Sequence, residues 1–139
     1  MKIINGENLI LGRVASRVAK AALLGEETIV LNCEKMMVTG NHQTVIGHQR
    51  FLDDLKGKPN RGRFYYVRPD MFVRRSIRGM LPKNPRGKIA YSHVKCYISV
   101  PEPFKGKSSE TFEADNLSKV PNLKYMSVAE ICRLMGGTW

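Results

Sequence analysis

Apolar and polar positions follow two different periods over the first third of the chain. A short apolar stretch at residues 3–4 predicts a strand, and the polar residues 5–8 predict a turn. Over residues 11–24 apolar side chains recur every three or four positions, which predicts a helix that packs by one face. The β-branched run at residues 28–32 predicts a strand buried on both faces. Strand, helix and strand in this order predict a right-handed βαβ unit.

A second helix is expected after a turn at Gly40 and Asn41. Asn41 is a favourable N-cap residue, and the pattern carries the helix to near Leu55. Its apolar residues Val45, Leu52 and Leu55 are expected to face the core.

Proline marks the start of two further helices, both rich in basic residues. Pro69 opens the first, with Asp70 in its first turn, and Asn84 caps a shorter one that begins at Pro85. On a helical wheel, one half of the first of these helices carries Phe72, Val73, Ser76, Ile77 and Met80, and the other half carries Arg74, Arg75 and Arg78. Three guanidinium groups are therefore expected to project together.

The last third of the chain predicts a strand, an arm and a helix. Residues 95–100 are typical of another strand, and the polar stretch beyond them predicts an extended arm over residues 101–126. A terminal helix is expected over residues 127–136, because Ser127 and Glu130 form a capping box at its start.

Helices that alternate with short apolar strands predict an α/β fold with a mainly parallel sheet covered on both faces. No repeat or long linker divides the sequence, so residues 1–139 are expected to form a single domain. The composition, 42% hydrophobic and 25% charged, is that of a globular domain, and no apolar run is long enough to span a membrane. The polar start of the chain is unlike a signal peptide, which predicts a cytoplasmic protein.

The net charge of +11 is concentrated in the middle of the chain. Residues 1–55 hold six basic and six acidic side chains, and residues 96–139 hold five of each. Residues 56–95 hold twelve basic side chains against the single acid Asp70. Such charge repels itself unless a polyanion covers it, which predicts binding to nucleic acid. A membrane surface is the rival polyanion, but this segment lacks the sustained apolar stripe that an interfacial helix buries in lipid.

Aromatic residues interrupt the basic segment. Phe64, Tyr65 and Tyr66 lie between Arg63 and Arg68, where an exposed ring would stack on an unpaired base. The same residues also fit a strand with at least one ring in the core, and this interpretation is the stronger of the two.

Enzyme signatures are weak. Glu34 follows the second strand at the place of a ribose-binding acid, but Gly6 and Gly12 do not form the GxGxxG turn that a dinucleotide needs. Residues 40–47, GNHQTVIG, lack the Lys and Ser or Thr of a phosphate-binding loop. No GxSxG elbow or credible carboxylate pair is present. An RNA-modifying or nucleotide-binding enzyme with a Rossmann-like sheet remains the alternative to binding without catalysis.

Metal and cofactor signatures are also weak. Cys33, Cys96 and Cys132 stand far apart and are expected to be free, buried thiols. The histidines have no ligand spacing, so neither a metal nor a cofactor is expected.

Three stretches of sequence resemble a known family. LGRVASRVAKAALLGE at residues 11–26, IVLNCEKMMVTGN at 29–41 and GRFYYVRPDMFVRRSIRGMLPKNPRGKIA at 62–90 resemble large-subunit ribosomal protein thirteen in its archaeal and eukaryotic form. The resemblance implies a three-layer α/β/α domain with a short, mainly parallel sheet of about four strands. It also implies a protein without catalysis that takes part in early large-subunit assembly.

The resemblance carries over onto basic residues that the charge count also selects. The residues expected to face ribosomal RNA are Arg61, Arg63, Arg68, Arg74, Arg75, Arg78, Lys83, Arg86 and Lys88. The implied partners are 23S-type large-subunit RNA and neighbouring ribosomal proteins, with no membrane, small-molecule substrate or homo-oligomer. Ser92 and His93 stand where the family is usually more basic, and Ser99 stands where a glycine is commoner.

Overall fold

The computed structural model of the chain describes residues 1–55, 66–121 and 124–139. Its centre is a parallel sheet in the order β1 (Lys2–Asn5), β2 (Thr28–Leu31) and β4 (Val94–Cys96). All four residues of β2 are buried, because this central strand has a neighbour on each side and is covered on both faces. The apolar run therefore predicted β2 correctly.

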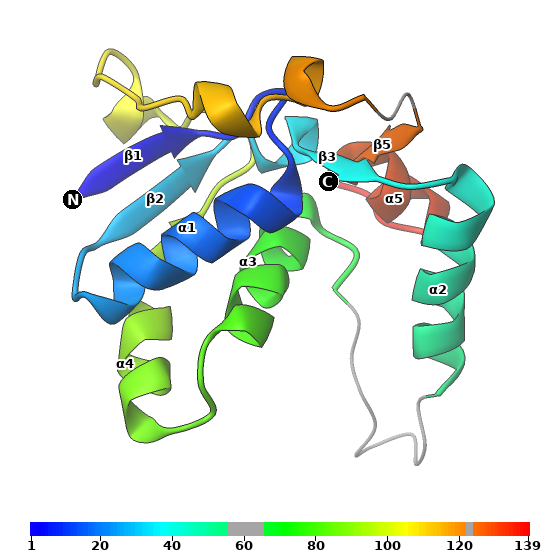
Figure 1. The fold of residues 1–139 in the computed structure, drawn as a ribbon, viewed down its shortest axis with the longest axis horizontal. Helices are drawn as coiled ribbons and strands as arrows, with labels where there is room; N and C mark the ends of the chain where they lie inside the picture. Colours follow the sequence, from blue (N-terminus) through cyan, green and yellow to red (C-terminus); the bar gives the residue numbers. More distant parts are fainter. Residues whose placement is uncertain (56–65, 122–123) are drawn as a thin grey trace.

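Three helices lie on one face of this sheet: α1 (Leu11–Leu23), α3 (Pro69–Met80) and α4 (Pro85–Ser92) (Figure 1). Val14 and Val18 of α1 pack with Val73 and Ile77 of α3, and all four side chains are at most 1% exposed. Burying side chains of this size contributes about 1.5–3 kcal/mol each. The core between these helices therefore forms because α1 and α3 each have one apolar face and pack these faces together.

The opposite face of the sheet is covered by the chain that follows β4. Ile3, Ile29 and Leu31 pack there against Tyr97, Val100 and Phe104. The covering segment is extended and contains a 3₁₀ turn at Glu102–Phe104, where a helical layer was expected. The mixed α/β class with a short, mostly parallel sheet is confirmed.

The strand predicted over residues 95–100 is too long, because β4 ends at Cys96. The chain then turns at Ser99, whose φ of +56° is in the left-handed region. The carboxylate of Glu34 accepts a hydrogen bond from the Ser99 backbone N–H at 3.0 Å and fixes this turn. A left-handed backbone favours glycine, which accounts for the glycine expected here from the family resemblance.

A second, antiparallel sheet joins distant parts of the sequence. It pairs β3 (Met37–Thr39) with β5 (Tyr125–Ser127), and the terminal helix α5 (Val128–Leu134) follows directly. The Ser127 hydroxyl accepts a hydrogen bond from the Glu130 N–H at 3.2 Å, so the predicted cap is confirmed. The sequence did not predict β3, because a strand of three residues carries almost no periodic signal.

Helix α2 (His42–Asp54) forms as predicted, but the residues expected to anchor it are only partly right. Ile46 is its one buried residue, packed against Met126 and Ile131, and Val45 and Leu52 are half-buried. Leu55 is 55% exposed, so the expectation that it faces the core is wrong. The core contact of α2 lies in its first turns, and its last turns extend beyond the core (Figure 1).

The arm predicted over residues 101–126 lies on the chain's own α1 and β1. Glu110 exchanges backbone hydrogen bonds with β1. Arg17 of α1 holds the buried carboxylate of Asp115, with 2.6 Å between Nε and Oδ2, and its guanidinium lies over the Phe112 ring. Arg13 donates a hydrogen bond to the Ala114 carbonyl at 3.2 Å. Two basic residues of α1 are therefore structural anchors of the arm.

Cys33 and Cys132 are buried as expected, whereas Cys96 is half-buried. The buried thiol of Cys132 predicts a loss of stability at high pH. Burial, with a smaller contribution from nearby Asp70, raises the pKa of Cys132 from 9.0 to about 12. The folded state therefore holds the Cys132 proton more tightly than the unfolded state, so this contribution to stability is complete below pH 9 and falls as the pH rises toward 12. We expect the difference in urea midpoint between wild type and Cys132→Ala to shrink from pH 8 to pH 11. Parallel pH curves for the two proteins would contradict this.

Candidate nucleic-acid interface

Residues 69–92 of the basic segment form α3, α4 and the connection between them, a helical hairpin (Figure 1). Both helices begin at a proline, whose fixed φ suits the first helical position and whose missing N–H is not needed there. The Asn84 side chain accepts a hydrogen bond from the Gly87 N–H at 2.8 Å and caps α4, as predicted. Both helices pack on α1, which holds them in a fixed mutual orientation.

Four cationic side chains at the connected ends of these helices are exposed, and we call them the α3–α4 surface. They are Arg78, Lys83, Arg86 and Lys88. In the part of the chain that the structure describes, no acidic side chain forms an ion pair with any of the four. Arg86 donates a hydrogen bond to the Leu23 carbonyl at 3.4 Å, which directs it toward the end of α1. The positive charges of these four side chains are therefore exposed to water and are not neutralised by a described acidic side chain.

Arg74 has a different environment from the one the helical wheel suggested. Its guanidinium lies over the ring of Tyr91 on α4, 4.5 Å from the ring centre. The side chain is half-buried, and its Nε is buried without a hydrogen-bond partner. Arg75 is also half-buried, whereas Arg78 is exposed. The three guanidinium groups therefore differ in exposure, and Arg74 links α3 to α4.

Asp70, the single acid of the basic segment, pairs with Arg68 at the start of α3. The two side chains are 3.1 Å apart, and Arg68 is 60% exposed. An exposed ion pair of this kind contributes up to about 1 kcal/mol, so Arg68 remains available to an outside anion. Arg61 and Arg63 lie outside the described residues, as do Phe64 and Tyr65. Tyr66 is described and is 49% exposed.

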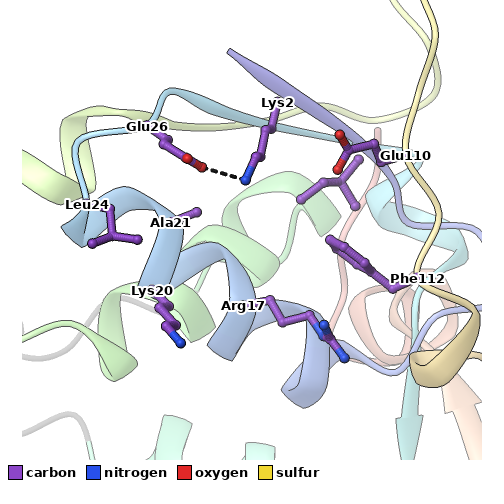
Figure 2. A pocket seen from close by; sticks show the side chains of 9 residues that line it. Lys2, Arg17, Lys20, Ala21, Leu24, Glu26, Glu110 and Phe112 are labelled. Carbon is purple, nitrogen blue, oxygen red and sulfur yellow. Dashed lines mark ion pairs between the residues drawn. The ribbon is translucent and has the colours of Figure 1, made fainter.

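A separate pocket of about 280 Å³ lies between α1, β1 and the arm. Ile4, Leu24 and Phe112 give it apolar walls. At its rim Lys2 and Glu26 form an ion pair with 2.8 Å between Nζ and Oε2 (Figure 2). The hydrogen bond with Glu26 raises the pKa of Lys2 above its ordinary value, so this amine stays charged. No pattern in the sequence predicted this pocket, because the residues of the arm do not indicate which part of the fold the arm contacts.

Within residues 1–55, 66–121 and 124–139, no helix has the length and apolar character needed to cross a lipid bilayer. No cluster of three or more His, Cys, Asp or Glu side chains there is arranged to hold a metal ion. Glu34, considered above as a ribose-binding acid, instead holds the turn at Ser99.

The fold and the α3–α4 surface together define a small mixed α/β protein in which two basic helices present a group of exposed cations. Comparison with known families agrees with the resemblance seen in the sequence. The family model for ribosomal protein L13 matches residues 1–103. This chain belongs to the ribosomal protein L13 family.

Curated relatives match almost the whole chain. The large ribosomal subunit protein uL13 of Methanococcus maripaludis is 43% identical over 141 residues, covering 98% of each chain. The protein of the same name from Sulfolobus acidocaldarius is 37% identical over 138 residues, covering 97% of this chain and 93% of the relative. That from Methanosarcina barkeri is 36% identical over 138 residues, covering 98% of each.

Proposed function

We propose that this chain is a structural component of the large ribosomal subunit. It binds large-subunit ribosomal RNA through the α3–α4 surface and supports early assembly of the subunit. Family membership supports the ribosomal role. The observation that carries the RNA-binding role is the set of exposed cations without acidic partners among the described residues.

The proposed mechanism is binding without turnover. Arginine and lysine side chains of the α3–α4 surface neutralise phosphates of folded RNA, and the release of counterions drives association. The packing of α3 and α4 on α1 fixes where these charges stand, so the surface reads the shape of the RNA backbone. Paired RNA hides its base edges in a deep, narrow groove, and contacts therefore fall mostly on phosphates and 2′-hydroxyls.

The α3–α4 surface provides a direct test of this role. We expect the triple variant Arg78→Gln, Lys83→Gln and Lys88→Gln to bind a transcript of large-subunit RNA on the order of 10²-fold more weakly at about 100 mM salt. The three side chains are exposed, so the thermal midpoint of the free protein should stay unchanged. Filter binding measures the affinity, and circular dichroism measures the midpoint.

A matched control removes the same charge elsewhere. Lys105, Lys107 and Lys119 are exposed in the arm, and their joint replacement by glutamine should change RNA affinity by less than about threefold. Equal losses for the two triple variants would show that net charge alone governs binding, which would refute the assignment to α3 and α4.

A further inference from the structure

Two aromatic side chains lie on neighbouring segments near the N-terminal end of α3. Trp139, the single tryptophan of the sequence, is 42% exposed, and Tyr66 is 49% exposed. A Cβ on Gly137 would stand 2.4 Å from the Val67 carbonyl oxygen, so the backbone next to Tyr66 runs directly against the backbone that leads to Trp139. Only glycine permits this approach.

The turn after α5 holds the tryptophan in place. Gly136 has a φ of +87° and ends the helix, and the Gly137 N–H donates a hydrogen bond to the Cys132 carbonyl at 2.9 Å. The ring of Trp139 returns over α5, where the Arg133 guanidinium lies 5.6 Å from its centre. A ring that already contacts a neighbouring side chain has less freedom to lose on binding than a ring without contacts.

Cations border both aromatic residues. Arg133 lies against Trp139, and Arg68 follows Tyr66 closely in the chain with a side chain that is 60% exposed. An unpaired nucleotide combines a flat π-face with a phosphate, and rings beside guanidinium groups match both parts. An RNA supplies phosphates to the exposed parts of both guanidinium groups and an apolar protein surface does not, so RNA is the better match.

Tyr66 and Trp139 lie near one end of α3, and the α3–α4 surface lies at the other end. Helix α3 has 12 residues, and at about 1.5 Å per residue it is about 18 Å long. Tyr66 precedes its first turn, and Arg78 lies in its last turn. One RNA that lies along α3 can therefore contact the cations at one end and the aromatic side chains at the other.

We propose that Tyr66 and Trp139 form a stacking site for unpaired bases of the RNA that the α3–α4 surface holds. This inference rests on the proposed function and adds a class of nucleotide that the basic residues alone do not select. The sequence pattern indicated stacking as one role for Tyr66 but did not indicate a role for Trp139.

The single tryptophan makes the site directly observable. The full chain is titrated with two RNAs of equal length, a single-stranded oligoadenylate and a fully paired duplex, and both binding and Trp139 emission are followed. Stacking with a base quenches indole fluorescence, so we expect strong quenching by oligoadenylate at saturation. The duplex keeps its bases stacked on each other and should quench weakly at equal saturation.

Variants separate stacking from charge. Trp139→Leu and Tyr66→Leu should each weaken oligoadenylate binding by roughly 5- to 150-fold, the equivalent of one lost stacking contact, and change duplex binding by less than about threefold. Trp139→Phe keeps a ring and should recover most of the affinity. Thermal midpoints identify any variant that fails to fold. The quenching experiment uses the wild-type protein, so it tests the stacking site even if a variant is unfolded.

The outcomes distinguish this inference from the proposed function. If both RNAs bind while Trp139 emission stays unchanged, the stacking site is refuted and the basic surface stands. Equal quenching by the two RNAs would also refute stacking. If neither RNA binds at low salt, the proposed function itself fails.

Discussion

The affinity of this protein for large-subunit ribosomal RNA is expected to fall about 10³- to 10⁵-fold between 50 and 200 mM monovalent salt. This range corresponds to roughly 6 to 10 neutralised phosphates on a duplex-like target. The described part of the basic segment supplies Arg68 and the four cations of the α3–α4 surface, all of them exposed. Filter binding at five or more salt concentrations, with magnesium held constant so that the RNA stays folded, gives the slope.

The slope of log K against log salt also reports how many phosphates the protein contacts. Each lost phosphate contact lowers the slope of log K against log salt by about one, so the Arg78, Lys83 and Lys88 triple variant should be shallower by about three. The arm variant at Lys105, Lys107 and Lys119 should keep the wild-type slope. A salt response that is flat for the wild type would mean that phosphates do not dominate binding, and the proposed function would be wrong.

Local signals in the sequence predicted most of the helical framework. The apolar spacing of α1 and the prolines before α3 and α4 act within a few residues, so they can be read without knowledge of the fold. The capping contacts of Asn84 and Ser127 are local for the same reason. What the sequence could not provide are pairings between distant segments, such as β3 with β5.

The basic residues illustrate the same limit at the level of side chains. Arg17, Arg74 and Arg78 all lie on the polar side of an amphipathic helix. A helical wheel predicts the direction of each side chain but not what the side chain contacts. Their neighbours come from elsewhere in the chain: Asp115 pairs with Arg17, and Tyr91 stacks on Arg74. Arg78 has no such partner among the described residues and remains in solvent. One residue type therefore serves as arm anchor, helix link and candidate RNA contact.

This division of roles bears on how RNA-facing residues are selected. A count of positive charge placed all nine candidates in one class, because charge is a property of composition. Burial and stacking then remove Arg74 from the freely exposed members of that class. Among the seven candidates that the structure describes, the four of the α3–α4 surface are exposed and have no acidic partner, so they are the better target for tests of binding.

Replacing Gly87 with alanine is expected to disrupt the hairpin that carries this surface. A Cβ on Gly87 would stand 1.8 Å from the carbonyl oxygen of Pro82, in the connection between α3 and α4. The obstacle is backbone, so no side-chain rotation relieves it, and α4 must move away from the connection. We expect a loss of about 3 kcal/mol or more and a fall in thermal midpoint of about 10 °C.

Gly79 provides the matched comparison on α3. A Cβ there would meet nothing within 4 Å, so Gly79→Ala should stabilise the protein by up to about 1 kcal/mol through helix propensity. Calorimetry of the two variants should therefore give shifts of opposite sign. Because the movement of α4 displaces Arg86 and Lys88, Gly87→Ala should also bind RNA more weakly than Gly79→Ala, even below its melting transition. Equal thermal midpoints for the two variants would show that the connection between α3 and α4 accommodates the added methyl group without strain. The close packing of Gly87 on Pro82 would then not be what fixes the relative position of the two helices.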